Sequence, residues 1–285
     1  MQASAKPGKP KGTQSIAKAA LVLRSLSTFG SGGAKLKDVC AVTGLPKPTA
    51  HRILAALLAE RLIERPAAAR EYRLGPELFA LGATIADIFD LKGLARESLE
   101  RLAKETGDTI YLGMRCGFDG LCLDRVYGSS APGHLILEVM DRWPLGIGSF
   151  SLAILSFLPD AEIADIVAYN RRRVSGRDLA TFERIPQTVQ KTRRNGYAFR
   201  SMRSQRGLAG VAVPIIDAKL RPVASLCATA TGQRMAGEHL EDVVRRLRRE
   251  AAAIARKYEV ARLRREQHET WRAALRPEAP GRLPG

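Results

Sequence analysis

Residues 43–82 read TGLPKPTAHRILAALLAERLIERPAAAREYRLGPELFALG, and this stretch decides how the first part of the chain folds. Gly44 and Pro46 mark a tight turn between two short helical patterns, at 36–42 and 47–61. The apolar positions of the second pattern recur at helical spacing and are Ile53, Leu54, Leu57 and Leu58. A third helical pattern covers 14–29. Two helices joined by a glycine-containing turn predict a helix-turn-helix.

The second helix of such a pair enters the major groove of DNA with its first residues toward the bases. Those residues here are Lys47, Pro48, Thr49, His51 and Arg52. Arg52 can donate two hydrogen bonds to a guanine, and His51 can reach a base or a phosphate. Pro48 fits the first turn of a helix, where a missing N–H costs little. The alternative is a plain three-helix packing unit.

Two short strand-like segments, 62–65 and 71–74, follow the third helical pattern around a small basic loop. This layout predicts a wing, which favours DNA binding over a packing unit. The arginines of the wing are placed to contact the DNA backbone beside the groove, and they are Arg65, Arg70 and Arg73.

Composition supports a nucleic-acid partner. The chain has 285 residues and a formal net charge of +17, and residues 1–74 carry 13 lysines and arginines against 4 acidic residues. Such a basic segment attracts polyanions. The length suggests about two domains of roughly 100–200 residues each. No apolar run is long enough to span a membrane and no signal peptide begins the chain, so we expect a cytoplasmic protein without a membrane partner.

The sequence gives no sign of metal, cofactor or catalytic chemistry. The four cysteines form no CxxC pair and the four histidines are scattered, so neither a zinc site nor a disulfide framework is expected. Asp119, Asp124, Glu138 and Asp141 do not share a helix face, and no nucleophile motif or phosphate-binding loop is present. We therefore expect no cofactor and no enzyme activity.

The stretch 43–82 resembles the DNA-binding region of the isocitrate-lyase-regulator (IclR) type of bacterial transcription factor. Members typically read GLPKSTVHRLL, then a variable wing, then YRLG and LG. Pro48 stands where the family usually has Ser, which removes one phosphate contact. The resemblance continues to about residue 260 through TGDTIYLG (106–113), LCLDRV (121–126), WPLGIGSFSLAILSFLP (143–159), NGYAF (195–199), GLAGVAVPIIDAKLRPVASLCATA (207–230) and Arg234.

The resemblance implies an α+β architecture. It places a winged helix-turn-helix domain at 15–74 after a disordered basic arm at 1–14, a linker helix at 75–92, a GAF-like α/β effector-binding domain at 93–260, and a charged, partly disordered tail at 261–285. In the family the linker helix joins subunits; the alternative is a helix packed on its own domain. Sequence patterns predict a linker helix at 76–90, an amphipathic helix at 94–106 and a closing helix at 237–269. Strands are predicted at 109–115, 120–126, 135–140, 207–216 and 222–229.

The turn at 144–149 opens a helix, and a helix start favours a carboxylate or another anion. Family pocket positions, carried over by resemblance, are Gly148, Ser149, Arg200, Gly210, Cys227 and Thr229. Relatives often have His and Thr at Gly146 and Gly148, so the two glycines are expected to widen the turn. Relatives also often have Asp, Cys and Ser at Arg200, Gly210 and Cys227.

Arg200 is expected to pair with an acidic effector if it faces inward, and is otherwise a surface arginine. Four apolar residues are candidates for the apolar side of the pocket and equally for ordinary sheet core: Met114, Leu123, Leu135 and Leu137. The effector suggested by this combination is an aromatic or otherwise bulky organic acid.

These features predict a ligand-responsive transcriptional regulator, dimeric or tetrameric, that reads a pseudo-palindrome in double-stranded DNA and senses a small organic acid. Repressor and activator are both open. One alternative is a non-regulatory, architectural DNA-binding protein whose C-terminal domain only oligomerises. Another is an enzyme or sensor whose basic N-terminal part binds a protein.

Overall fold

The protein is described by a computed structural model that covers residues 14–66, 70–83, 86–131, 137–202 and 207–274. By its internal contacts the chain divides into two units, Met1–Ala86 and Asp87–Gly285, which are described separately. Most of the predicted basic arm and the end of the predicted tail lie outside the described residues.

The first unit is built on three helices, α1 (Gln14–Ser27), α2 (Leu36–Thr43) and α3 (Lys47–Ala59), with a single 3-10 turn at Gly30–Gly32. Gly44 ends α2 with φ +67°, and its N–H donates to the Cys40 carbonyl at 2.9 Å. This left-handed residue lets the chain reverse within a short turn. The buried core is Val22, Leu26, Ala34, Val39, Leu54, Leu57, Ile63 and Tyr72.

The predicted wing is present as two short antiparallel strands, β1 (Ile63–Glu64) and β2 (Arg73–Leu74). Tyr72 and Ala34 exchange two backbone hydrogen bonds of 2.8 and 2.9 Å, which tie the wing to the segment before α2. A Cβ on Gly75 would lie 2.3 Å from the Arg61 carbonyl oxygen, so only glycine fits at this position. Helix α4 (Pro76–Ala83) follows.

The second unit contains one antiparallel six-stranded sheet with the order β5-β4-β3-β8-β7-β6. Its strands are β3 (Thr109–Cys116), β4 (Asp119–Val126), β5 (Arg142–Pro144), β6 (Ala198–Met202), β7 (Leu208–Ile216) and β8 (Pro222–Thr231). Residues directly opposite in neighbouring strands point their side chains to the same face, so register alone assigns each residue to one of two layers.

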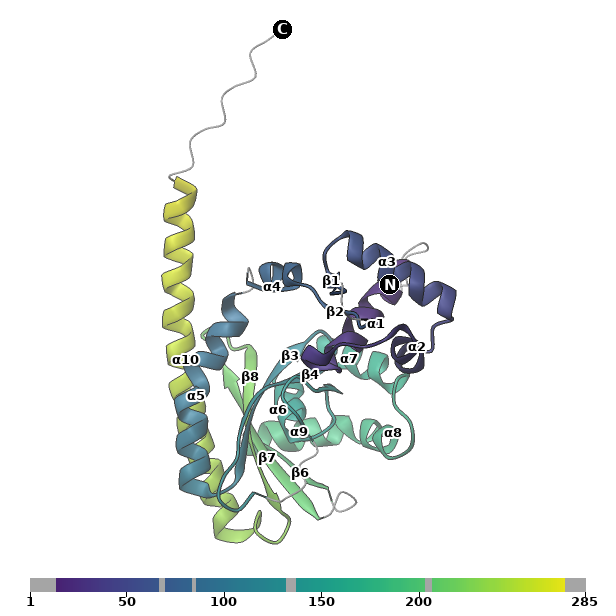
Figure 1. The fold of residues 1–285 in the computed structure, drawn as a ribbon. Coiled ribbons are helices and arrows are strands. Elements are labelled where there is room, and N and C mark those ends of the chain that lie inside the picture. Colours follow the sequence, from purple (N-terminus) through teal and green to yellow (C-terminus); the bar gives the residue numbers. More distant parts are fainter. Residues whose placement is uncertain (1–13, 67–69, 84–85, 132–136, 203–206, 275–285) are drawn as a thin grey trace, which may run out of the picture. The chain divides into compact units, whose positions relative to one another are not determined.

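Helices cover both faces of this sheet (Figure 1). Helices α5 (Ala86–Thr106) and α10 (Gly237–Ala274) pack on one face, around Leu99, Leu112 and Leu247. The other face carries α6 (Ser149–Ser156), α7 (Asp160–Arg171), α8 (Gly176–Glu183) and α9 (Ile185–Asn195). Each layer has its own apolar core.

Two glycines bring α6 down onto the sheet. A Cβ on Gly113 would lie 2.1 Å from the ring of Phe150, and one on Gly120 would lie 2.7 Å from the same ring. The Phe150 ring therefore occupies the space that side chains at these strand positions would take. This close approach fixes the start of α6 against β3 and β4.

Two predicted element boundaries are wrong. The predicted end of the linker helix at Asp90 is absent, because α5 runs without a break from Ala86 to Thr106. Leu91, Ala95 and Leu99 form one buried stripe along it, and Gly93 is tolerated inside the helix. Of the predicted strand 135–140, the described residues 137–140 form a loop, and the edge strand is Arg142–Pro144 instead.

Helix α10 has 38 residues and continues five residues past its predicted end at Glu269. At about 1.5 Å per residue it is about 57 Å long. No helix in the described part of the chain is long and apolar enough to cross a membrane. Nor do the described residues bring three or more His, Cys, Asp or Glu side chains together for a metal ion.

Candidate DNA interface and effector site

Helix α3 separates a buried face from an exposed one. Ala50, Leu54 and Leu57 are buried at helical spacing against α1 and α2. On the exposed side lie Lys47, Pro48, His51 and Arg52, while Thr49 is half-buried. All five residues predicted to read DNA thus lie in the first two turns of α3, and four of them are open to solvent.

The start of α3, the start of α2 and the wing enclose a surface groove of about 620 Å³. Lys47 and His51 of α3 line it together with Arg65 and Arg70 of the wing. Two further cations that the sequence analysis did not single out, Lys35 and Lys37, line it as well. Five lysines and arginines around one groove give it a positive charge that suits the phosphates of a nucleic-acid backbone.

Thr49 and Arg52 lie on the other side of α3. They line a second hollow of about 460 Å³ between α1 and α3, with Ile16, Ala19 and other mainly apolar residues. The α3 residues that were predicted to contact DNA therefore do not form one surface patch. Lys47 and His51 share a groove with the wing, whereas Arg52 projects from the α1 side of the helix.

The three predicted wing arginines differ in their surroundings. Arg65 is exposed and its guanidinium lies 5.4 Å from the centre of the Tyr72 ring, a cation–π contact that orients it. Arg70 is exposed. Arg73 is half-buried, and its Nε is shielded from solvent without a hydrogen-bond partner among the described residues. Arg65 and Arg70 are therefore the wing cations that a phosphate could reach.

In the second unit, a row of four residues crosses four neighbouring strands on the α6 face. Arg200 of β6 lies opposite Gly210 of β7, Gly210 lies opposite Thr229 of β8, and Thr229 lies opposite Thr109 of β3. We call these four residues the polar row. Because they are in register, their side chains share one face of the sheet.

Arg200 has an unpaired edge. Its Nε and Nη2 atoms are shielded from solvent and have no hydrogen-bond partner among the described residues. These two nitrogens form one side of the guanidinium, the side that binds a carboxylate through two parallel hydrogen bonds. Burial lowers the pKa of Arg200, because desolvation disfavours the charged form. Arg200 is therefore a half-buried cation without a counter-ion among the described residues.

The start of α6 lies over the polar row. A Cβ on Gly210 would lie only 2.3 Å from Ser149 Oγ and 3.4 Å from Thr229 Oγ1, so the Ser149 hydroxyl takes the space above Gly210, between Arg200 and Thr229. Gly148 precedes α6 with φ +76° and has no side chain that could cap the helix. In the first turn of α6, the Phe150 N–H donates to the Cys227 thiol.

Cys227 joins the same cluster as a neutral thiol. Its Sγ lies 3.7 Å from Ser149 Oγ and 3.8 Å from Thr229 Oγ1. Burial raises the pKa of Cys227 to about 11, because a thiolate would be desolvated there. Gly146 plays a different part from the one expected. A Cβ there would lie 2.7 Å from Ile185 Cδ1, so α9 fills that space and the turn is not widened.

Residues 83–256 match the family described as bacterial transcriptional regulator IclR, C-terminal, and residues 15–67 match the IclR helix-turn-helix domain. The chain belongs to the IclR family. Together the two matches cover both units that the fold shows, which confirms the predicted family.

Individual IclR relatives agree with this assignment. The glycerol operon regulatory protein of Streptomyces griseus is 30% identical over 85% of this chain and 95% of its own length. A crystal structure of an IclR-type regulator from Silicibacter sp. TM1040 has a TM-score of 0.68 at 22% identity, covering 86% of this chain and 96% of that one. An IclR homologue from Microbacterium hydrocarbonoxydans, solved with 4-hydroxybenzoate, has a TM-score of 0.67 at 22% identity, covering 86% and 99%.

The IclR comparisons confirm the predicted α+β class, with an N-terminal helix-turn-helix and a C-terminal antiparallel sheet with helices. Members of the family are transcriptional regulators and not enzymes, as expected from the sequence. The C-terminal family match ends at residue 256, whereas α10 continues to Ala274.

Met114 and Leu123 do not line the predicted effector site of this IclR chain. Both pack in the layer of α5 and α10, on the opposite face of the sheet from the polar row. Leu137 is buried in the α6 layer beside Tyr111 and Cys122. Leu135 lies outside the described residues.

Thr109 is the residue of the polar row that the sequence analysis missed. Its side chain is fully buried, and its Oγ1 has no hydrogen-bond partner among the described residues. A signal was present, because Thr109 and Tyr111 are two residues apart in a strand and their side chains therefore point to the same face. The sequence alone did not show that this face is the one that α6 covers.

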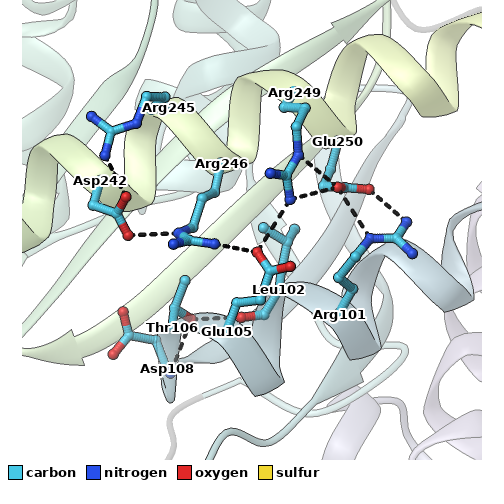
Figure 2. Close-up of polar contacts among 10 residues, drawn as sticks. All are labelled: Arg101, Leu102, Glu105, Thr106, Asp108, Asp242, Arg245, Arg246, Arg249 and Glu250. Carbon is cyan, nitrogen blue, oxygen red and sulfur yellow. Dashed lines mark hydrogen bonds and ion pairs between the residues drawn. The ribbon is translucent and has the colours of Figure 1, made fainter.

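An ion-pair network joins α5 to α10 on the other face of the sheet (Figure 2). Arg101 binds the nearly buried Glu250 through two hydrogen bonds of 2.9 and 3.2 Å. Burial alone would raise the pKa of Glu250, but hydrogen bonds from Arg101, Ser98 and Arg249 outweigh it and lower the pKa to about 2. Glu105 accepts from both Arg246 and Arg249.

The junction between α5 and β3 is also held by an ion pair and by further polar contacts. Asp108 is fully buried and pairs with Arg234 Nε at 2.7 Å and His239 Nε2 at 2.8 Å. Arg234 Nη2 also donates to the Thr106 carbonyl at the end of α5. The short connection between α5 and the polar row is therefore fixed to the segment that leads into α10.

Proposed function

We propose that this chain is a transcriptional regulator whose DNA binding responds to a small organic acid. The observation that carries the proposal is the unpaired Nε–Nη2 edge of Arg200, which lies opposite Gly210 where Ser149 of α6 approaches the sheet. An uncompensated half-buried guanidinium is costly unless an anion completes it. A carboxylate has the charge and the planar two-oxygen shape that this edge accepts.

The proposed effector-binding residues are those expected from the family resemblance: Gly148, Ser149, Arg200, Gly210, Cys227 and Thr229. Register and contact distances support their grouping, since Arg200, Gly210 and Thr229 face one another and Ser149 and Cys227 adjoin them. The relative that is solved with 4-hydroxybenzoate supports an aromatic acid as one member of the effector class.

We propose that residues 15–74 read DNA. The exposed start of α3 would enter the major groove, and Arg52, Thr49 and His51 would contact base edges. Lys47, Arg65 and Arg70 would bind phosphates from the groove that they line. A homodimer or homotetramer acting in the cytoplasm would place two such helices on a pseudo-palindrome, with half-sites about one helical turn apart or a multiple of it.

Acid binding regulates only if the acid binds the DNA-competent and DNA-incompetent states with different affinity. A coupling free energy of about 1–3 kcal/mol is ordinary for such a response. Residues 75–92, which include α4 and the first turns of α5, are the covalent link between the two units, and we propose that they carry the change.

The test uses the full chain and DNA selected from a random-sequence pool. Fluorescence anisotropy then gives the affinity for the selected duplex with and without benzoate, 4-hydroxybenzoate and short aliphatic acids. We expect sequence-selective, salt-sensitive binding that changes about 5- to 150-fold at saturating acid. Matched measurements with Arg200→Lys, which keeps the charge but lacks the two-nitrogen edge, should show a much weaker response.

The rival functions give different results in the same assay. An architectural protein binds DNA with little sequence preference and ignores every acid. A sensor whose basic N-terminal unit binds a protein shows no salt-sensitive DNA affinity. Either result would contradict the proposed function.

A further inference from the structure

The polar row has two unsatisfied ends and a satisfied middle. At the β6 end, the Nε and Nη2 of Arg200 have no partner among the described residues, and at the β3 end the same holds for Thr109 Oγ1. Between them, the hydroxyls of Ser149 and Thr229 contact Cys227. The row spans three strand spacings, which is about 14 Å between the outer α-carbons. The ends, rather than the middle, are thus where hydrogen-bonding groups are missing.

Thr109 differs from Arg200 in chemistry. Its hydroxyl is neutral and can both donate and accept one or more hydrogen bonds, so it suits a hydroxyl, carbonyl or amide and not a second charge. A molecule with a carboxylate at the Arg200 end and a neutral polar group toward the Thr109 end would satisfy both, with the Ser149 side chain displaced from the space above Gly210. The aromatic ring of Tyr111, on β3 and in the same layer, favours an apolar body between the two groups.

Thr109 is also the row residue nearest in sequence to the DNA-binding unit. Helix α5 ends at Thr106, and Thr109 begins β3. The movement of the residues between them is restricted. Asp108 is held by Arg234 and His239, and the Thr106 carbonyl is held by Arg234. At its other end, α5 begins at Ala86, where the chain passes from the first unit to the second.

We propose that Thr109 contacts the neutral polar end of the effector and that this contact passes effector occupancy to α5. The inference rests on the proposed function, since it takes Arg200 as the carboxylate anchor. Arg200 supplies affinity from β6, at the edge of the sheet. Thr109 supplies the response, because a shift of its strand end is carried through the fixed Asp108 junction into the helix that leads back to the DNA-binding unit.

Four acids test the contact between Thr109 and the effector. 4-Hydroxybenzoate is compared with benzoate, and the longer 4-hydroxycinnamate is compared with cinnamate, so that each pair differs only by the hydroxyl. Calorimetry of the full chain compares the wild type with Thr109→Val, which keeps the shape but removes the hydroxyl. We expect the variant to bind at least one hydroxylated acid about three- to tenfold more weakly, the effect of one lost hydrogen bond. Its affinity for benzoate and cinnamate should not change.

Hydrogen exchange of the same proteins tests the transmission. In the wild type, the better-bound hydroxylated acid should slow amide exchange in β6 and β7 and also in α5 and the 106–109 junction. Thr109→Val should keep the protection of β6 and β7 and lose that of α5, and Thr109→Ser should restore it. Thr188→Val, on α9 and outside both the polar row and the Asp108 junction, is the matched control and should behave as the wild type.

The outcomes separate the two proposals. A wild type that binds none of the four acids overturns the proposed function, and this inference with it. Acid binding with an unchanged hydroxyl preference or an unchanged α5 response in Thr109→Val overturns the inference alone. Loss of benzoate binding in Thr109→Val also overturns the inference alone, because Thr109 would then act as an anchor or a structural residue.

Discussion

Replacement of Arg200 by methionine should make the acid-free protein more stable. Methionine keeps a long apolar stem in the half-buried site but removes a guanidinium whose Nε and Nη2 have no partner among the described residues. Most core substitutions destabilise a protein, so an increase is a specific expectation. The lowered pKa of Arg200 has the same physical origin, since burial penalises its charge.

The size of the effect follows from the two unsatisfied donors. Leaving buried polar groups without hydrogen bonds costs about 1–3 kcal/mol. Removing them should therefore raise the free energy of unfolding by about 1–3 kcal/mol. For a unit of about 200 residues, each kcal/mol corresponds to roughly 2–4 °C in Tm. The same substitution should weaken carboxylate binding about 10- to 100-fold, because charge-assisted hydrogen bonds contribute about 1.5–3 kcal/mol.

Thermal and urea denaturation of the full chain, with and without a binding acid, measure both effects. Arg194→Met is the matched control, since Arg194 is an exposed arginine of the same unit, and it should change neither quantity. The acid should raise the Tm of the wild type and leave Arg200→Met unaffected. If Arg200→Met is less stable than the wild type, or binds acids equally well, the guanidinium is satisfied in some other way and the reasoning fails.

Three further results are expected. Arg52→Ala should lower affinity for a selected DNA site by about 1–3 kcal/mol and relax its sequence preference, whereas Arg65→Ala should weaken all duplexes equally; anisotropy on matched and mismatched sites would expose any failure of that contrast. Gly210→Ala should turn the Ser149 hydroxyl away, since the added Cβ would lie 2.3 Å from it, and calorimetry should show about three- to tenfold weaker acid binding. The pKa of Glu250 is lowered to about 2 from an ordinary 4.5, so its ion pair stabilises the fold fully above about pH 4.5 and progressively less as pH falls toward 2. The ion pair of Glu250 contributes at most about 3 kcal/mol to the free energy of unfolding. Glu250→Gln should therefore reduce the change in stability between about pH 4.5 and 2, as measured by urea denaturation. An unchanged pH dependence in this variant would exclude a contribution from Glu250.

Local pattern was sufficient for most elements. The helix-turn-helix followed from apolar spacing and from the turn at Gly44, which indeed takes a left-handed φ. The two boundaries that failed both depend on distant neighbours. The break expected after Asp90 is absent because Leu91 begins a stripe that packs against α10 and the sheet. The loop at 137–141 resembled a strand in sequence, but Arg125 holds it by bonds to Glu138 and the Leu137 carbonyl.

The site was harder to derive because a sequence shows alternation but not which face is covered. Tyr111 and Leu123 are both large, buried strand residues, yet they lie in opposite layers. The sequence also cannot show that Arg200 and Thr109 lack hydrogen-bond partners, since this depends on how three neighbouring strands and α6 pack around them. The resemblance supplied six of the proposed site residues, and strand register added Thr109.

The ion pairing of the second unit changes what the charge of +17 means for an approaching polyanion. Among the described residues, one ion pair, Lys35–Glu71, lies in the first unit, while all the others, including the α5–α10 network, lie in the second. Many arginines of the second unit are therefore paired, but this unit still has a net charge of +9 spread over 199 residues, against +8 on the 86 residues of the first unit. Positive charge is thus about twice as dense per residue in the first unit. An approaching polyanion is therefore attracted by both units and most strongly, for its size, by the smaller one.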